Sequence, residues 1–123
     1  MSELKPTSAF KKMYKKVKKN PRWQPIFNGQ VPFEHDERSP WDYVVDHFLQ
    51  DLPLPDYFYE HPITLSNQQK KELKKRLSNI DNLKITGLDL HFDGHNGDHL
   101  LLYAKTNQQI IYLVGIGSHS DLF

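Results

Sequence analysis

Residues 100–117 read LLLYAKTNQQIIYLVGIG, two apolar stretches on either side of a polar break. Residues 100–103 are a short apolar run and residues 110–116 are apolar and β-branched, a composition typical of strands. The polar residues 106–109 fit the turn of a hairpin. Upstream, residues 83–92 partly alternate between apolar and polar side chains, and the turn-forming residues 94–97 follow them. The sequence therefore predicts three strands in an antiparallel meander.

Helical spacing of apolar residues precedes this meander. The first predicted helix has an apolar stripe made of Phe10, Met13, Tyr14 and Val17, and Asn20-Pro21 ends it. The second begins at Ser39-Pro40, ends by Pro53, and has a stripe made of Trp41, Val44, Val45, Phe48, Leu49 and Leu52. A third runs from about Asn67 to Ser78, because Ser66 and Gln69 are spaced as a capping box and Leu73, Leu77 and Ile80 lie on one side.

The order of these elements predicts the fold class. With a short extended piece before Phe10, the chain reads β-α-α-(α)-β-β-β. We expect an α+β domain with its helices packed on one face of a small antiparallel sheet. The chain of 123 residues is the length of one domain, residues 1–123, in which the helix at about 66–79 is an insertion. Residues 22–38, rich in proline and acidic side chains, are predicted to be an irregular connection that packs against the core.

Composition excludes several classes of site. The chain has no cysteine, so thiol nucleophiles, zinc thiolate sites and disulfide frameworks are excluded. The longest apolar run, residues 110–114, is far shorter than the ~20 residues of a membrane span, and lysines follow the N-terminus in place of an apolar signal segment. We therefore expect a soluble cytoplasmic protein without membrane contacts.

The basic residues are unevenly distributed. Net charge is only +1, but lysines crowd the first twenty residues and a second basic cluster consists of Lys70, Lys71, Lys74, Lys75 and Arg76. Two cationic surfaces could meet a phosphate backbone while the total charge stays near zero. The alternative is that these lysines are the solvated faces of amphipathic helices.

Histidines and carboxylates offer two kinds of site. His61, His91, Asp98, His99 and His119 lie at the ends of predicted strands and in loops, and histidine both donates and accepts protons near neutral pH. Cleavage of RNA needs few other groups, because the 2′-hydroxyl of the RNA is itself the nucleophile. The simpler interpretation of each histidine by itself is a polar group at the surface. The second kind of site is a metal centre built from His91, Asp93, His95, Asp98 and His99, although this spacing matches no established motif.

Three separated segments carry a family resemblance. Residues 115–123, GIGSHSDLF, closely resemble the end of YafQ-like toxins, in which a strand delivers a Gly-Ser/Thr-His step followed by Leu-Phe. Residues 52–55 (LPLP) and Glu60-His61-Pro62 resemble the segment after the second long helix of that family. His91, Asp98 and residues 100–103 follow in the family order. Together with the first two predicted helices, these segments make the chain resemble the RelE/ParE superfamily over about two thirds of its length.

The resemblance implies an activity and its partners. It implies that His61, His91, Asp98 and His119 form an acid–base group, that Phe123 holds a base, and that the protein cleaves mRNA in the ribosomal A site without a cofactor. It also implies neutralisation by a cognate antitoxin, with operator DNA bound only through the antitoxin complex. Our preferred roles are His119 as general acid, His61 or His91 as general base, and Asp98 as the group that orients a partner. The alternative for Phe123 is a plug in the core.

The chain departs from the family at two arginine positions. Relatives often carry arginine shortly before the histidine matched by His91 and on the last strand, where this chain has Leu88 and Gly115. Arginine counters charge on a phosphate, so the basic cluster at residues 70–76 is the expected substitute. The missing arginines also keep open an alternative function, a non-cleaving inhibitor on the same scaffold that binds the ribosome or DNA gyrase.

Overall fold

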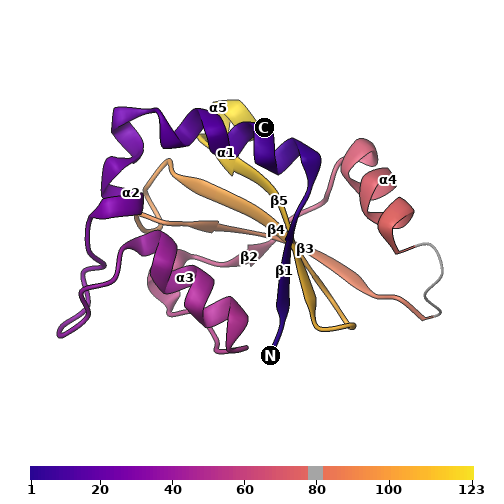
Figure 1. Cartoon of the computed structure of the whole chain (residues 1–123), viewed down its shortest axis with the longest axis horizontal. Helices are drawn as coiled ribbons and strands as arrows, with labels where there is room; N and C mark the ends of the chain where they lie inside the picture. Colours follow the sequence, from indigo (N-terminus) through magenta and orange to yellow (C-terminus); the bar gives the residue numbers. More distant parts are fainter. Residues whose placement is uncertain (78–81) are drawn as a thin grey trace.

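Five strands form a single mixed sheet at the centre of the molecule (Figure 1). Across the sheet the order is β1 (Glu3–Pro6), β5 (Ile110–Gly117), β4 (Leu100–Thr106), β3 (Ile85–His91) and β2 (His61–Pro62). The structure, a computed structural model, describes residues 1–77 and 82–123. The predicted α+β class, with a strand and helices before a three-stranded meander, is confirmed.

The meander β3–β4–β5 is antiparallel as predicted, but the two outer strands differ from the prediction. β1 pairs parallel with β5, with Leu4 opposite Ile111, so the sheet is mixed and not wholly antiparallel. β2 adds a short antiparallel edge strand beside β3, with His61 opposite Asp89. Apolar periodicity shows that a segment is extended, but it does not show the direction of its neighbour.

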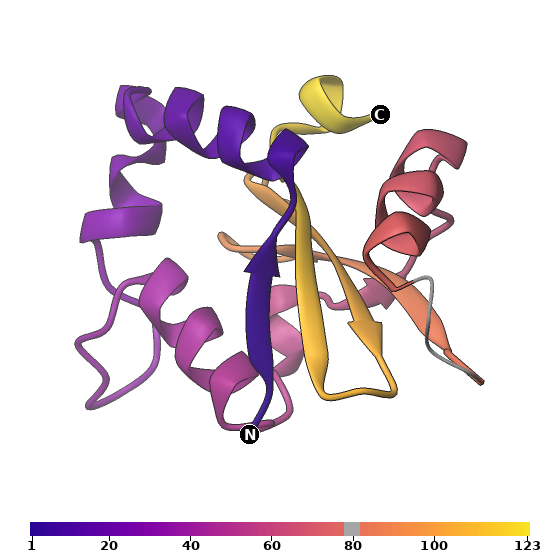
Figure 2. The ribbon, with the colours of Figure 1, turned by 45° about the vertical axis from the view of Figure 1, so that its right-hand side comes forward.

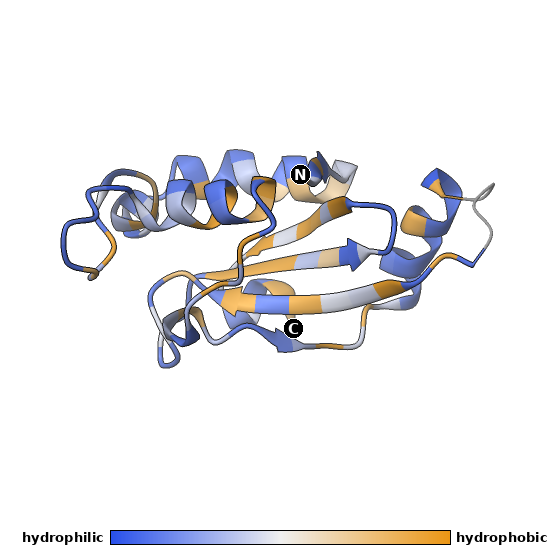
Figure 3. Ribbon diagram, turned by 90° about the horizontal axis from the view of Figure 1, so that it is seen from below, coloured by the Kyte–Doolittle hydropathy of each residue, from blue (hydrophilic) through white to orange (hydrophobic). Residues whose placement is uncertain are grey.

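Three helices cover one face of the sheet, which we call the first face (Figure 2). They are α1 (Ser8–Lys18), α2 (Gln24–Asn28) and α3 (Pro40–Leu49). Their buried side chains, including Phe10, Ile26 and Val44, pack with Leu90 and Tyr103 of the sheet. Figure 3 shows apolar residues along the strands and polar residues on outer turns of the helices, as amphipathic helices require.

The connection after α1 is more regular than predicted. A 3₁₀ turn (Pro21–Trp23) leads directly into α2, where Pro25 stands in the first turn, a position that needs no backbone N–H. Trp23 is buried and Phe33 packs against the core, so the predicted packing of this segment is confirmed. A second 3₁₀ turn, Asp56–Phe58, brings the chain from α3 to β2.

The opposite face of the sheet, the second face, is covered by α4 (Asn67–Arg76) and α5 (His119–Leu122). Leu73 and Leu77 at α4 and Leu122 of α5 pack with Val114 of β5, so the helices lie on both faces and not on one. Propensity and periodicity predict that a helix forms, but they do not say which side of a sheet it covers. The predicted end of this helix at Ser78, and Ile80 beyond it, lie outside the described residues.

Local capping interactions appear where the sequence predicts them. Gln69 N–H donates to Ser66 Oγ at 3.2 Å, and Ser66 N–H donates to Gln69 Oε1 at 2.8 Å, which completes the capping box of α4. Ser39 Oγ likewise accepts from Asp42 N–H at the start of α3. Within the described residues, no helix is long and apolar enough to cross a membrane.

An irregularity in β5 sets the direction of the C-terminal segment. Leu102 pairs with Gly115 whereas Tyr103 pairs with Leu113, so Val114 is an extra residue in β5. This bulge places Ile116 in the core of the first face and Gly115 under Leu122 on the second face. The chain therefore enters α5 on the second face.

Candidate functional site

Three histidines from distant parts of the chain lie together on the second face. His61 comes from β2, His91 from the end of β3, and His119 from the start of α5. The ring centroids of His61 and His91 are 6.0 Å apart, and those of His91 and His119 are 5.5 Å apart. The structure thus brings together the imidazoles that the sequence proposed as one group, although their catalytic roles stay a prediction.

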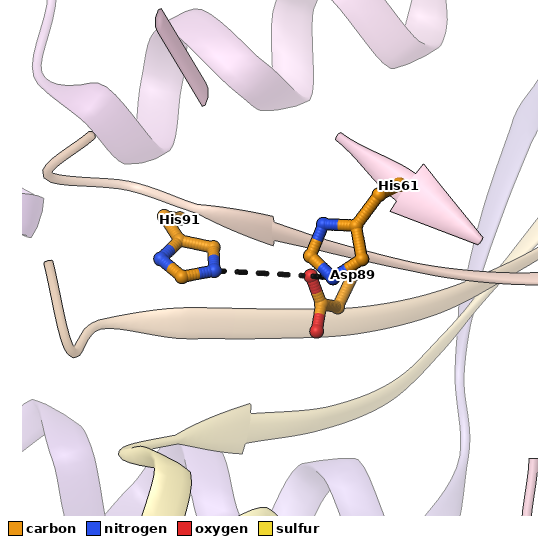
Figure 4. A group of neighbouring side chains, drawn as sticks. All are labelled: His61, Asp89 and His91. Carbon is orange, nitrogen blue, oxygen red and sulfur yellow. Dashed lines mark ion pairs between the residues drawn. The ribbon is translucent and has the colours of Figure 1, made fainter. Parts of the chain in front are cut away.

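A buried carboxylate, Asp89, lies between two of these histidines (Figure 4). Asp89 Oδ1 is 2.9 Å from His61 Nε2 and 4.0 Å from His91 Nε2, and the residue is only 3% exposed. Burial raises the pKa of the Asp89 carboxyl, and the nearby histidines partly offset this effect. Sequence reasoning missed Asp89. Its signal was a charged residue between two leucines, two positions before His91 and therefore on the same face.

Backbone carbonyls orient both of these histidines. His61 Nδ1 is 2.7 Å from the Tyr59 carbonyl oxygen, and His91 Nδ1 is 3.0 Å from that of Gly97. Because a carbonyl oxygen only accepts, Nδ1 carries the hydrogen in each ring. The Nε2 atom of each ring therefore faces Asp89.

His119 and Asp98 form a second pair. Asp98 Oδ1 accepts hydrogen bonds from the His119 backbone N–H at 2.8 Å and from its ring Nδ1 at 2.7 Å. These two bonds, the backbone one most of all, lower the pKa of the Asp98 carboxyl. The His119 side chain is 57% exposed, so Nε2 on the other edge of the ring can meet a ligand. Asp98 thus contacts His119, and its orienting role stays a prediction.

Aromatic side chains border the histidines. Tyr59, which has a left-handed backbone (φ 50°) at the end of the 3₁₀ turn, lies with its ring centroid 4.6 Å from that of His61 and 4.0 Å from that of His95. Phe123 is 67% exposed and lies 6.3 Å from the His119 ring. The alternative of Phe123 as a core plug is therefore wrong, and both rings offer apolar surface to a ligand.

The basic cluster at residues 70–76 lies on α4, on the same face of the sheet as the histidines. Its four lysines are exposed, and Arg76 pairs with Glu72 at 3.6 Å. No hydrogen bond or ion pair among the described residues joins these side chains to the histidines. Their contact with a substrate stays a prediction.

The two positions without the expected arginine have different surroundings. Leu88 packs against the core of the first face, on the side of the sheet opposite the histidines. Gly115 lies beneath α5, where an added Cβ would come within 3.1 Å of Leu122 Cδ2. A side chain at position 115 would therefore meet Leu122 of α5, which would have to shift.

The metal centre proposed from sequence is not assembled. Asp93 Oδ2 contacts His99 Nδ1 at 2.6 Å, Asp98 contacts His119, and His91 faces Asp89. Four of the five residues therefore separate into different pairs, and the ring of the fifth, His95, lies against Tyr59. Among the described residues, the group whose ligand atoms converge is His61, Asp89 and His91, with all three atoms within 4.8 Å of one another.

Solved structures from two organisms share this fold. A chain of the DinJ-YafQ complex from E. coli matches with a TM-score of 0.60 and 18% identity, over 100% of this chain and 99% of that chain. A metal-bound toxin from Helicobacter pylori matches with a TM-score of 0.59 and 21% identity, and a copper-bound mutant toxin from the same organism with 0.59 and 20%, each over 100% of both chains. The predicted RelE-like fold is thereby confirmed. No protein family profile and no curated protein sequence match the chain.

Proposed function

We propose that this chain is the toxin of a toxin–antitoxin pair and cleaves mRNA on the ribosome by histidine acid–base catalysis. One observation carries the proposal. Three imidazoles separated by up to 58 positions in the chain gather on one face of the sheet, beside two exposed aromatic rings, in a fold shared with YafQ. Proton donors and acceptors next to surfaces that can stack on bases are what RNA cleavage requires.

The reaction needs two proton transfers. A base removes the proton of the 2′-hydroxyl, the 2′-oxygen attacks phosphorus, and the bond from phosphorus to the 5′-oxygen breaks as an acid protonates that oxygen. The products are a cyclic phosphate and a free 5′-hydroxyl. His119 supplies the acid, because Asp98 holds its Nδ1 and leaves Nε2 at the surface.

His91 is the base that the geometry favours. Its Nδ1 donates to the Gly97 carbonyl, so the lone pair of the neutral ring is on Nε2, 4.0 Å from Asp89. His61 Nε2 lies closer to Asp89, at 2.9 Å, and is less free to accept a proton from a substrate. His61 then stands at the edge of the site, where its ring is 32% exposed.

The test is direct. The purified protein is incubated with translating ribosomes, and new mRNA 5′ ends are mapped. New ends with 5′-hydroxyls are expected. If no new ends appear and DNA gyrase is inhibited, the alternative function, a non-cleaving inhibitor, replaces this proposal. The absence of arginine at positions 88 and 115 is the feature of the sequence that allows this alternative.

The partner is an antitoxin. The E. coli structure with the same fold is a complex, DinJ-YafQ, which supports a second protein bound to this one. Growth arrest on expression of the chain alone, relieved by the gene product of a neighbouring reading frame, is the expected behaviour of such a pair.

Asp98→Asn tests the positioning of the general acid. The amide keeps the size of the side chain but loses the charge that holds the His119 ring, so we expect kcat to fall about tenfold to a hundredfold. KM should not change, because Asp98 acts through His119 and not on the RNA. Asp98→Glu should recover part of kcat. Asp93→Asn, which alters the separate pair with His99, is the matched control. Equal losses in both asparagine variants would show a general effect on the loop.

Charge reversal on α4 tests the basic cluster. The double change Lys71→Glu and Lys75→Glu should raise KM for ribosomes roughly tenfold at low salt, with little change in kcat, because exposed lysines attract a phosphate backbone at long range. The difference should shrink as salt rises. Lys11→Glu with Lys15→Glu on α1 is the matched control, since α1 covers the other face. The same KM in both double variants would contradict a specific contact at α4.

A further inference from the structure

Tyr59 presents an aromatic ring at one end of the group of histidines. The residue is 42% exposed, and its ring centroid lies 5.4 Å from that of His91 and 4.6 Å from that of His61. Among the described residues no aromatic contact joins Tyr59 to His119 or Phe123, which contact each other. Tyr59 therefore lies at the His91 end of the site, and Phe123 lies at the His119 end.

The backbone at Tyr59 is strained. Its φ of 50° and ψ of 47° lie in the left-handed region, which bulky side chains seldom adopt and which glycine and asparagine adopt more easily. Strained backbone of this kind is concentrated at functional sites. A tyrosine at position 59 is therefore explained better by what its ring contacts than by the turn that it ends.

A flat heterocycle already lies against the Tyr59 ring. It is the imidazole of His95, an exposed residue between β3 and β4, whose centroid is 4.0 Å from that of Tyr59. In the part of the chain that the structure describes, no hydrogen bond or ion pair holds the His95 side chain, so its ring can move away without losing a polar contact. An imidazole is also one of the two fused rings of a purine. The surface that accepts His95 therefore suits a nucleobase, since tyrosine rings stack on bases.

We propose that Tyr59 stacks on the base of the nucleotide whose 2′-hydroxyl attacks, in the place that His95 takes in the free protein, and that it thereby selects a purine. A purine is preferred because its larger ring system stacks more strongly than that of a pyrimidine. Tyr59 is then a residue that determines specificity and takes no part in proton transfer.

The side of the cut that Tyr59 contacts follows from the mRNA cleavage proposed above, on which this inference rests. The general base takes the proton of the 2′-hydroxyl, which belongs to the nucleotide 5′ of the cut, and the acid protonates the 5′-oxygen of the next nucleotide. Tyr59 lies beside His91, the favoured base, and Phe123 lies beside His119, the acid. The two rings therefore hold the bases on either side of the broken bond.

Fluorescence on programmed ribosomes tests the stacking without reference to cleavage. The mRNA carries 2′-O-methyl groups in the A-site codon, which block the attack, and 2-aminopurine, whose fluorescence is quenched by stacking, at each codon position in turn. Tyr59→Asn should lose the quenching caused by the parent protein at one position, and Phe123→Ala should lose it one nucleotide further 3′. If Tyr59→Asn quenches like the parent at every position, the proposal is overturned.

The choice of Tyr59→Asn and two control variants separates stacking from folding. Asparagine suits the left-handed backbone, and the main-chain carbonyl that orients His61 is kept. Tyr59→Phe keeps the ring and should quench like the parent. His95→Ala removes only the ring that the base replaces, so quenching should persist. A loss in His95→Ala as large as that in Tyr59→Asn would contradict the replacement of His95 by a base.

Cleavage of mRNA with a randomised A-site codon tests the selectivity. The parent should cut after purines more often than after pyrimidines, and in Tyr59→Asn cleavage after purines should fall about tenfold, as expected for the loss of one base stack. The preference for the nucleotide 3′ of the cut should not change. An unchanged purine preference in Tyr59→Asn would overturn this inference and leave mRNA cleavage standing. If the parent does not cleave but its quenching still depends on Tyr59, the function proposed above fails and the base-stacking site stands.

Discussion

Replacement of His119 by alanine is expected to lower the rate of mRNA cleavage by about 10²- to 10⁴-fold, the contribution typical of a general acid. The folded structure should not change, because the His119 side chain is 57% exposed and the ends of α5 are held by other groups. Ser118 and Asp121 form a capping box, and Leu122 packs on β5. The measurement is single-turnover cleavage on ribosomes, with a thermal unfolding curve of the same sample.

The control for His119→Ala is the same change at His47. His47 lies on α3, where its Nδ1 contacts the Tyr43 carbonyl oxygen, and it has no part in the site. His47→Ala should cleave at the parental rate. A His119→Ala variant that cleaves as fast as the parent, or arrests growth equally, would remove His119 from the role of acid.

The largest expected loss of stability follows from Phe58→Ala. Phe58 is fully buried at the end of the 3₁₀ turn before β2, where its ring packs with Phe33, Tyr43 and Tyr57. Truncation of such a ring leaves a cavity and costs about 3–5 kcal/mol of the free energy of unfolding. For a domain of this size the midpoint of thermal unfolding should fall by roughly 10–20 °C. Denaturant unfolding followed by circular dichroism measures both quantities.

Phe123→Ala is the matched control for stability. Phe123 is 67% exposed, so the free energy of unfolding should change by no more than about 0.5 kcal/mol. Cleavage by Phe123→Ala should nevertheless weaken if its ring stacks on a base beside His119. Equal destabilisation by the two substitutions would mean that Phe123 is buried in solution, contrary to the structure.

The sequence predicted most of the residues that the structure brings together, but it did not predict Asp89. His61, His91, Asp98 and His119 came from short motifs whose order along the chain resembles a known family, and the structure places all four on one side of the sheet. Asp89 has no motif of its own. Asp89 joins the group through its burial and through His61 on the neighbouring strand, neither of which is a property of nearby sequence.

Local patterns were sufficient for α1, α3, α4 and the meander β3–β4–β5, but not for α2, β2 or α5. The capping box of Ser66 and Gln69, the start of α3 at Ser39 and the hairpin of β4 and β5 depend on residues a few positions apart, so side-chain chemistry and periodicity specify them. Contacts between distant segments settled the rest: the parallel pairing of β1 with β5, the place of α4 on the second face, and the bulge at Val114 that directs His119 to its neighbours. These features depend on which apolar surfaces bury one another. The free energy of that burial is set by the assembled chain and not by any single segment.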